Sequence, residues 1–197
     1  MRSRDEASLT SQIEQCIRSG RYREALEQAA SNYIDTVFRY CFRVLNADAV
    51  RARDVTQQVF EEVCKGIVNY RGDASIKTWI MAIAHNQCLK DIDTRHRQQT
   101  IVRVNQEHIA AHVHTDPPIA ADATVLSQEW LAQLQQALGQ LDAEARSILV
   151  MRFGVGVAHE LSTAEIARVL GISRAAAYRK LHEALQRVRR MLEHDER

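Results

Sequence analysis

Glycine and proline are scarce in this chain of 197 residues, which contains 7 glycines and 2 prolines. Both residue types mark turns and interrupt regular structure, so a chain this poor in them has few positions for the tight turns of a β-sheet. Ala, Gln, Arg, Glu and Leu are abundant instead, and all five are favourable in helices. The composition therefore predicts an all-α protein.

Long apolar runs are absent as well. No stretch approaches the roughly 18 consecutive apolar residues that a membrane span needs, although hydrophobic residues make up 46% of the chain and suffice for a core. The chain begins with the polar residues Met-Arg-Ser-Arg-Asp-Glu, unlike the apolar segment of a secretory signal. We therefore expect no membrane insertion and a cytoplasmic location.

Closely spaced cysteines are also lacking. The cysteines lie more than twenty residues apart and form no Cys-x-x-Cys motif, so the usual zinc-binding pattern is missing. Each has apolar neighbours at helical spacing, where a cysteine packs as a small hydrophobic residue. The sequence thus predicts buried free thiols at Cys16, Cys41, Cys64 and Cys88.

The pattern of apolar residues divides the chain into two parts. Between residues 21 and 97 they recur every three or four positions, which predicts three or four packed helices. Within this part, residues 70–75 have the composition of an exposed loop, in which Ser75 can cap the following helix. The helical period is lost in the middle of the chain, where both prolines lie. We therefore expect a domain at residues 1–97, a flexible linker at 98–126 and a second domain at 127–197, with the two domains moving relative to one another.

Three histidines lie in the expected linker, and a pair at positions i and i+4 of a helix can bind a metal ion. They are His108, His112 and His114. No cysteine or carboxylate completes a convincing set of ligands around them. We therefore expect no metal site.

A helix-turn-helix pattern lies near the C-terminus. Ser162 or Thr163 can cap its first helix, with Glu165 placed as in a capping box. Gly171 supplies a left-handed turn, and Ile172 is placed to fill the angle between the helices. Because these features fall at compatible spacings, the pattern favours a DNA-binding unit over an αα-hairpin with a solvated basic face.

The second helix of this pattern carries the residues expected to read DNA. It begins at Ser173, and Ala177 and Leu181 face inward. The residues that can face a major groove are Ser173, Arg174, Ala175, Ala176, Tyr178, Arg179 and Lys180. Between Ile172 and Arg190 there are six basic residues against one acid, so the outer face is positively charged. We expect base contacts from Arg174 or Arg179 and phosphate contacts from Lys180, Arg187, Arg189 and Arg190.

The N-terminal part carries a second motif. It consists of residues 54–63, residues 70–86, and Asp91 followed by the basic residues 95–97. These segments closely resemble the second conserved domain of the sigma-70 family. With a helix-turn-helix domain behind a linker, the chain is similar to sigma factors of the extracytoplasmic-function (ECF) type, which keep domains two and four. The resemblance covers roughly residues 22–97 and 130–192.

The resemblance implies two helical domains that act in transcription initiation. In the family, domain two opens the promoter −10 element, domain four binds the −35 element, and core RNA polymerase performs the chemistry, so we expect no catalytic residue and no cofactor. Bases pulled from a duplex need flat partners, polar edges and a cationic track. The residues that match the −10 segment are Arg71, Gly72, Ser75, Lys77, Trp79, Asn86, Lys90, Arg95 and Arg97. Core packing is an alternative role for Trp79, because it shares a helix face with Ile83.

The resemblance also implies a polymerase-binding face. Its residues are Arg51, Arg53, Asp54, Gln57, Gln58 and Phe60. Most ECF factors have the acidic cluster Asp-Ala-Glu-Asp there, and it grips a basic coiled coil of the polymerase; this chain has Arg51 and Arg53 in place of two of the acids. Like charges at an interface can cost several kcal/mol. We therefore expect the unmodified chain to bind polymerase poorly.

Two forms of control remain open. A subgroup of ECF factors that lacks the acidic cluster is controlled by Ser/Thr protein kinases, and this chain resembles that subgroup. Thr56 is the expected phosphorylation site, because a phosphate there would add roughly −1.5 to −2 charges within one helical turn of Arg53. Thr78 and Thr36 are lesser candidates. Many other ECF factors are held by an anti-sigma protein instead.

A stand-alone helix-turn-helix regulator, which binds DNA without polymerase, is the alternative class of protein. Such a regulator would carry a ligand pocket or an acidic receiver site in place of residues 71–86. That segment therefore favours a sigma factor, with core RNA polymerase and promoter DNA as its partners.

Overall fold

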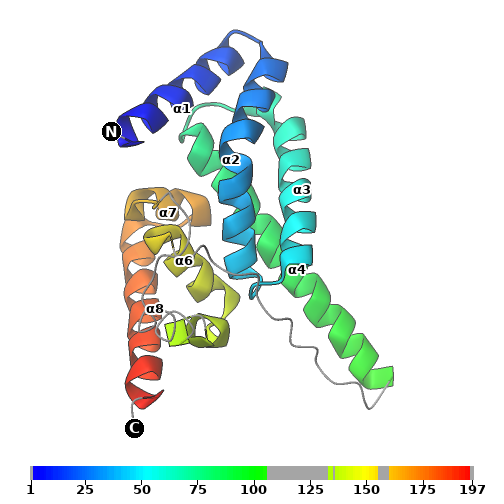
Figure 1. Cartoon of the computed structure of the whole chain (residues 1–197), viewed down its shortest axis with the longest axis vertical. Coiled ribbons are helices and arrows are strands. Elements are labelled where there is room, and N and C mark those ends of the chain that lie inside the picture. The colour runs from blue at the N-terminus through cyan, green and yellow to red at the C-terminus, as the bar shows by residue number, and fades with distance from the viewer. Residues whose placement is uncertain (1, 106–132, 135, 155–159, 196–197) are drawn as a thin grey trace, which may run out of the picture.

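The computed structural model describes residues 2–105, 133–134, 136–154 and 160–195 (Figure 1). Within these residues the chain forms helices and no strand, which confirms the all-α prediction. In chain order the elements are α1 (Arg2–Arg18), α2 (Tyr22–Val44), α3 (Ala49–Gly66), the 3₁₀ helix η1 (Ile67–Asn69), α4 (Ile76–Asn105), α6 (Ala143–Phe153), α7 (Thr163–Leu170) and α8 (Arg174–Asp195). None of the described helices is both long and apolar enough to cross a membrane.

Helices α1–α4 form the N-terminal unit, with α2 at its centre. Helix α2 packs against α1, α3 and α4, and its inward-facing Val37 and Tyr40 are buried. Helix α3 begins after Asp48, whose side chain accepts a hydrogen bond from the backbone N–H of Arg51 at 3.0 Å. The helices predicted between residues 21 and 97 are therefore α2, α3 and α4, with η1 after α3.

Helix α4 continues to Asn105, beyond residue 98, where the sequence predicts the linker to begin. Residues 93–98 are exposed, and the end of α4 projects away from the bundle (Figure 1). Residues 93–98 thus bury no apolar face, and the apolar period fades there although the helix goes on.

Helices α6, α7 and α8 form the C-terminal unit. Asp142 caps α6, since its carboxylate accepts a hydrogen bond from the backbone N–H of Ala145 at 2.8 Å. Gly154 ends the helix in the left-handed conformation, with a φ of 53°. Ile148 of α6 and Leu181 of α8 belong to one buried apolar cluster, which holds the two helices together.

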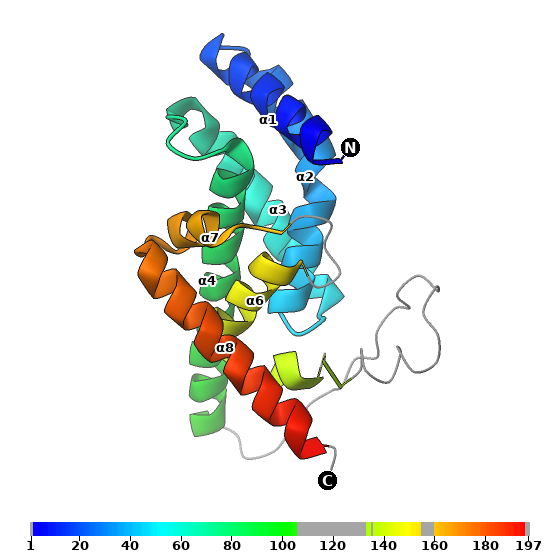
Figure 2. The ribbon, with the colours of Figure 1, turned by 90° about the vertical axis from the view of Figure 1, so that its left-hand side faces the viewer.

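The two units share an apolar core. Met151 of α6 and Ile166 of α7 belong to the same buried cluster as Tyr40 of α2 and Ile80 of α4. Helix α6 lies against α2, and α7 lies against α4 (Figure 2). The sequence predicts two units that move relative to one another, whereas this structure packs them together. The reason is that apolar side chains of both units meet across their boundary.

A buried polar cluster joins the units at the same place. Ser147 Oγ of α6 lies 2.9 Å from Tyr40 Oη and 2.8 Å from His85 Nδ1, and the last two atoms are 3.2 Å apart. All three side chains are buried. Burial lowers the pKa of His85 and raises that of Tyr40, so both groups are neutral at neutral pH.

Arg146 is a buried cation at the boundary of the units. Its guanidinium donates hydrogen bonds to the backbone carbonyls of Val44, Leu138, Gly139 and Leu141, at 2.7, 2.8, 3.1 and 2.6 Å. Val44 is the last residue of α2, and the final carbonyls of a helix lack partners within the helix and attract cations. Arg146 therefore ties α6 to the end of α2.

Candidate functional site

The loop predicted to read the −10 element lies between η1 and α4. Ser75 Oγ accepts a hydrogen bond from the backbone N–H of Thr78 at 3.2 Å, which confirms the predicted cap of α4. Gly72 has a φ of 79°, a conformation that favours glycine. Arg71, Gly72 and Asp73 are exposed, so the tip of the loop is open to a ligand.

Trp79 packs behind this loop. Its indole meets the ring of Tyr70 edge-on, with ring centroids 5.6 Å apart and planes at 62°. On another side the indole covers Gly66, where a Cβ would lie 3.0 Å from it. Trp79 is half-buried and also packs against the main apolar core. These contacts support the packing role that the sequence leaves open for Trp79.

Three of the residues matched to the −10 segment lie along one side of α4. Asn86, Lys90 and Arg97 are exposed, and their spacings of four and seven residues place them on the same face of the helix. Arg95 is exposed on a different face, where its Nε lies 3.9 Å from the carboxylate of Asp91. The structure therefore aligns the first three side chains and separates Arg95 from them.

Lys77, another of the matched residues, is 8% exposed. It lies in a hollow of about 620 Å³ whose walls come from the loop, from α1 and from the C-terminal unit. Two acidic residues of the C-terminal unit, Glu160 and Glu165, line this hollow. Glu165 also accepts a hydrogen bond from Thr78 Oγ1 at 3.4 Å. The first helix of the helix-turn-helix therefore lies beside the −10 loop.

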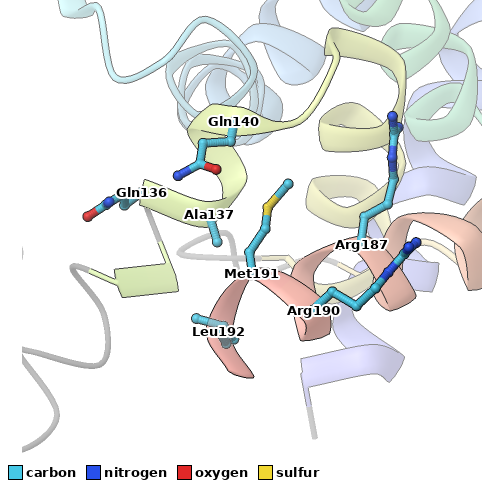
Figure 3. Close-up of a pocket in the computed structure, with 7 residues that line it drawn as sticks. All are labelled: Gln136, Ala137, Gln140, Arg187, Arg190, Met191 and Leu192. Atoms are coloured by element: carbon cyan, nitrogen blue, oxygen red, sulfur yellow. The ribbon is translucent and has the colours of Figure 1, made fainter. Parts of the chain in front are cut away.

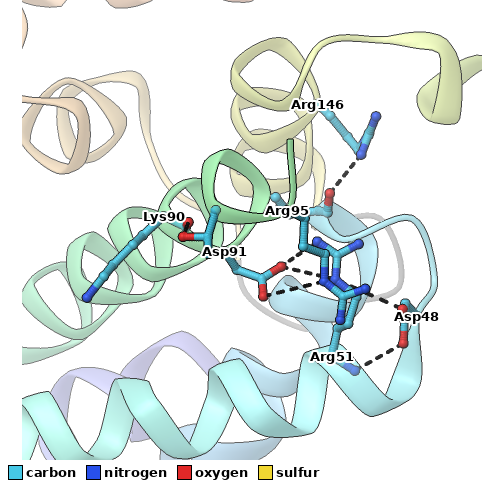
Figure 4. A network of polar contacts seen from close by, with 8 residues as sticks. Asp48, Arg51, Lys90, Asp91, Arg95 and Arg146 are labelled. Carbon is cyan, nitrogen blue, oxygen red and sulfur yellow. Dashed lines mark hydrogen bonds and ion pairs between the residues drawn. The ribbon is translucent and has the colours of Figure 1, made fainter. Parts of the chain in front are cut away.

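Arg51, matched to the polymerase-binding face, is paired inside the N-terminal unit. Its Nε donates to Asp91 Oδ2 at 3.0 Å, and a terminal nitrogen contacts the same oxygen (Figure 4). Asp48 lies 4.0 Å away, and the Arg51 side chain is only 16% exposed. The positive charge of Arg51 is therefore compensated within the N-terminal unit, and its contact with polymerase stays a prediction. Its main partner is 40 residues away in the sequence and becomes a neighbour because α3 packs against α4.

A groove between α2 and α3 is lined by several of the residues that the resemblance matches to polymerase binding. It has a volume of about 880 Å³ and an apolar surface that includes Ile34, Phe38 and Phe60. Arg53 and Gln57 also line it. Ile34 is 46% exposed, which is high for a large apolar side chain in a folded unit. Three of the matched residues, Arg53, Gln57 and Phe60, thus lie together in a groove suited to a partner with an apolar surface.

The other exposed residues of this face lie outside the groove. Gln58 lines a hollow against α4 together with Lys90 and Asp91. Asp54 is exposed on α3. Because successive positions on a helix point in different directions, the matched residues are divided between two sides of α3.

Cys64 lines the same α2–α3 groove and is exposed. The prediction of buried thiols is therefore wrong for Cys64, although it is confirmed for Cys16, Cys41 and Cys88. The physical reason is local: Val63, the residue before it, takes the buried position on α3, and the next residue points to another side of the helix.

The threonines considered as phosphorylation sites are all buried. Thr36 is 7% exposed, Thr56 is 6% exposed and Thr78 is 2% exposed. The hydroxyl of Thr56 donates to the carbonyl oxygen of Ala52 at 2.6 Å. Thr56 also lines the α2–α3 groove, so a phosphate there would face the same surface as Arg53.

The local geometry of the helix-turn-helix is as predicted. Ser162 Oγ accepts from the backbone N–H of Glu165 at 3.3 Å, and the Glu165 carboxylate accepts from the backbone N–H of Ser162 at 2.8 Å, which forms the capping box. Gly171 is left-handed, with a φ of 64°. Ser173 Oγ accepts from the backbone N–H of Ala176 at 3.2 Å and so begins α8. These residues set the angle between α7 and α8.

The start of α8 presents side chains predicted to read the −35 element. The exposed ones include Arg174, Ala175, Tyr178 and Arg179. Ala177 and Leu181 are buried, as their spacing predicts. Tyr178 is 64% exposed, which is unusual for an aromatic side chain and leaves its ring available for a contact with DNA.

Two of the basic residues predicted to contact phosphates are paired with acids at the start of α6. Lys180 Nζ lies 3.0 Å from the carboxylate of Glu144, and Arg187 pairs with Asp142. Hydrogen bonds from the backbone N–H of Ala145 and from Arg187 lower the pKa of Asp142. A phosphate that binds Lys180 or Arg187 therefore competes with these carboxylates.

A separate groove lies at the other end of α8. Its volume is about 490 Å³, and it lies between the last turns of α8 and residues 136–140 (Figure 3). Met191 and Leu192 give it apolar surface, and Arg187 and Arg190 also line it. Because it is several helical turns from the start of α8, it does not belong to the surface predicted to read bases.

The histidines of the central segment, His108, His112 and His114, lie outside the described residues. Among the residues that the structure does describe, no group of His, Cys, Asp and Glu side chains has the arrangement of a metal site. The absence of a metal role for the three histidines stays a prediction.

The fold and these surfaces define a class: an all-α protein in which a helix-turn-helix follows a helical unit with an exposed loop. Comparison with protein-family models identifies the family. Residues 30–98 match the model of Sigma-70 region 2, and residues 137–190 match the model of Sigma-70, region 4. The chain belongs to the sigma-70 family and is a sigma factor of the ECF type.

Curated relatives cover most of the chain. It is 27% identical over 164 residues to RNA polymerase sigma factor YlaC of Bacillus subtilis (strain 168), a match that covers 83% of this chain and 90% of that protein. It is 24% identical over 176 residues to ECF RNA polymerase sigma factor SigX of the same organism, with 86% and 84% covered.

Solved structures show the same fold. The sigma factor RpoE of Bartonella quintana, in complex with the anti-sigma factor NepR, matches with a TM-score of 0.64 at 15% identity over 85% of this chain and 96% of that chain. CnrH, in complex with the cytosolic domain of CnrY, matches with a TM-score of 0.59 at 20% identity over 95% and 96%. At these identities the likeness shows the fold alone.

Sequence reasoning misses two residues that shape these surfaces. Glu14 bonds to groups 56 and 62 residues away, and Arg146 bonds to a carbonyl 102 residues away. The one signal for Arg146 is its place two residues before the apolar run that begins at Ile148. A charged residue this close to a buried run is itself buried only with partners. Glu14 carries no comparable signal.

Proposed function

We propose that this chain binds core RNA polymerase and directs it to promoters with separated −35 and −10 elements. The order of the two matched regions carries this proposal, together with the exposed loop in the first and the exposed start of α8 in the second. The loop at 70–75 and the basic side of α4 hold the −10 element, while Arg174 and Arg179 read the −35 element. Core polymerase supplies the phosphodiester chemistry, so this chain contributes recognition and strand opening.

The closed packing of the two units has to open in this process. Glu165 of the helix-turn-helix is in hydrogen-bond contact with Thr78 beside the −10 loop, and reading two separated elements at once requires the units to part. We assign the units to residues 1–97 and 127–197, with residues 98–126 as the connection between them.

Reconstitution with sigma-free core polymerase tests this function. We expect the purified chain to support initiation at a specific promoter, and Arg71→Ala and Arg174→Ala to reduce it. Arg23→Ala is a matched control, because the Arg23 side chain is 94% exposed on α2 and lies in neither surface. Binding to promoter DNA without any effect on polymerase would instead favour a stand-alone helix-turn-helix regulator.

We propose that phosphorylation of Thr56 by a Ser/Thr kinase regulates the binding of this chain to core polymerase. Thr56 and Arg53 line the same groove on the polymerase-binding face, so a phosphate of roughly −1.5 to −2 charges would offset the positive charge of Arg53 there. The pairing of Arg51 with Asp91 leaves Arg53 as the arginine that matters for this effect. The Thr56 hydroxyl is buried and bonded to Ala52, so a kinase needs α3 to open locally.

Core-polymerase affinity tests this form of control. We expect kinase treatment to raise the affinity, Thr56→Ala to abolish the increase, and Arg53→Glu to raise the affinity of the unmodified protein. Arg39→Glu, which changes an exposed arginine of α2, is the matched control. Tight binding by the unmodified chain contradicts the proposal.

Control by an anti-sigma protein is the second candidate. It is favoured by the two solved relatives, whose structures contain the anti-sigma factor NepR and the cytosolic domain of CnrY. Under this form of control the unmodified chain binds polymerase tightly, and a purified anti-sigma protein prevents that binding. The affinity of the unmodified chain therefore separates the two candidates.

A further inference from the structure

Glu14 of α1 holds both ends of the −10 loop. Its Oε1 accepts a hydrogen bond from the Tyr70 hydroxyl at 2.9 Å and another from the backbone N–H of Ile76 at 3.1 Å. Tyr70 lies at the start of the loop, and Ile76 is the first residue of α4. One carboxylate oxygen thus closes the loop from a helix that precedes the matched region at 30–98.

The bond to Ile76 satisfies a group that α4 cannot satisfy itself. The first N–H groups of a helix have no partner within it, and they carry the positive end of the helix dipole. Ser75 takes the N–H of Thr78, and Glu14 takes that of Ile76. A negatively charged acceptor is favourable at this position.

The bond to Tyr70 fixes the other end. The Tyr70 hydroxyl also lies 2.5 Å from the carbonyl oxygen of Ala74, inside the loop. Its ring packs edge-on against Trp79, which in turn lies close against Gly66. Desolvation and the bond to Glu14 raise the pKa of Tyr70, so its hydroxyl stays protonated and remains a donor. Both ends of the loop are therefore held by hydrogen bonds, while its tip at residues 71–73 is exposed.

We propose that Glu14 is a positioning residue for promoter opening: it holds the loop at 70–75 in the shape that receives an unpaired base of the −10 element. Because this role rests on the proposed reading of the −10 element by the loop, it deepens that function. A loop ordered before binding loses less conformational entropy when it captures a base. Glu14 touches neither polymerase nor DNA in this role, and acts through Tyr70 and Ile76.

The test uses holoenzyme reconstituted with the full chain. Promoter opening is followed by the fluorescence of a 2-aminopurine in the −10 element, and core-polymerase affinity is measured in parallel. We expect Glu14→Ala to slow opening about tenfold, as for a polar group left without its partner, with unchanged core affinity. Glu14→Gln keeps an acceptor oxygen and should retain most of the rate. Gln15→Ala, at an exposed neighbouring position of α1, is the matched control.

Tyr70→Phe keeps the aromatic packing but removes the bond to Glu14 and the contact with the Ala74 carbonyl oxygen. It should slow opening, and the double variant should lose less than the sum of the two single losses, because both substitutions remove the bond between Tyr70 and Glu14. If Glu14→Ala fails to fold, Tyr70→Phe carries the test, and an unchanged opening rate in that variant overturns the proposal.

Arg71→Ala separates failure of this role from failure of the proposed function. If Arg71→Ala slows opening and Glu14→Ala does not, Glu14 has no positioning role and the function of the loop stands. If neither variant slows opening, the loop does not read the −10 element. If Glu14→Ala lowers core affinity and melting temperature along with the opening rate, its role is structural and the proposal is overturned.

Discussion

The guanidinium of Arg146, on α6, donates a hydrogen bond to the backbone carbonyl of Val44, the last residue of α2, at 2.7 Å. Its other bonds go to carbonyls between Leu138 and Leu141. Burial lowers the pKa of Arg146 from its usual value, but the group remains a cation at neutral pH and is compensated by these dipoles. A single side chain thus joins the end of one unit to the start of the other.

Replacing Arg146 should destabilise the closed structure. We expect Arg146→Met to lower the free energy of unfolding by about 1.5–3 kcal/mol, the range for hydrogen bonds that involve a charged group. Urea denaturation measures this change. Arg39→Met, at an exposed position of α2, should stay within about 0.5 kcal/mol of the parent protein. Equal stability of the two variants would show that the Arg146 bonds contribute nothing.

His85 should make the stability of the protein depend on pH. Burial lowers the pKa of His85 in the folded state below the ordinary 6.5, and the charge of Glu144 offsets part of this shift. The two side chains in hydrogen-bond contact with His85, Tyr40 and Ser147, are neutral. The unfolded chain then binds a proton more readily than the folded one. Neutral His85 therefore makes its full contribution to the free energy of unfolding when the pH is above the ordinary pKa of 6.5. This contribution decreases as the pH falls through that value.

Urea denaturation between about pH 5 and 8, the range in which histidine titrates, checks this dependence. We expect His85→Gln to lose the part of the pH dependence that lies below neutrality. His182→Gln, at an exposed position of α8, should keep it. An identical pH profile for the parent protein and His85→Gln would contradict the prediction.

Arg174 and Arg179 should determine the choice of −35 sequence. If either side chain makes a bidentate contact with a base, its replacement by alanine should weaken recognition of the −35 element by about 1–3 kcal/mol. Competition between the preferred promoter and variants of its −35 element measures this loss. Arg23→Ala is the control, because the Arg23 side chain is exposed on α2 and lies outside the surface predicted to contact DNA. If promoter choice is unchanged in both variants, α8 does not read the element with these residues.

Arg51 and Arg53 should differ in their tolerance of an acidic substitution. Arg51→Asp would place a third carboxylate beside Asp48 and Asp91 and remove the bonds to Asp91. We expect it to lower the free energy of unfolding by about 1.5–3 kcal/mol. Arg53→Glu, at an exposed position, should change it by less than about 0.5 kcal/mol. Equal tolerance of both substitutions in a thermal or urea melt would show that the Arg51 bonds are absent in solution.

Much of the fold follows from short stretches of sequence. The capping box of Ser162 and Glu165, the left-handed Gly171 and the cap at Ser75 all involve residues within a few positions of one another, and all were predictable. The outward and inward positions at the start of α8 follow from helical spacing in the same way. The expected burial of Cys64 was wrong because a helical period shows that a helix has an apolar face, but not where that face ends.

The candidate sites were only partly predictable. The motifs place the loop at 70–75 and the start of α8, but they do not show that Lys77 is covered, that Arg51 is paired with Asp91 or that Thr56 is buried. Each of these facts depends on a neighbouring helix. Glu14, which closes the loop, lies outside both matched regions.

By itself, the sequence determined the helical class, the boundaries of the helix-turn-helix and the membership of the sigma-70 family, because caps, glycines and apolar periods act over a few residues. Only the tertiary structure decided which charges are paired, which threonines are covered and how the two units meet. The partners in those contacts lie as far apart as the 40 residues between Arg51 and Asp91 and the 107 residues between Tyr40 and Ser147. Helix packing brings these partners together, and no local sequence pattern predicts which helices pack against each other.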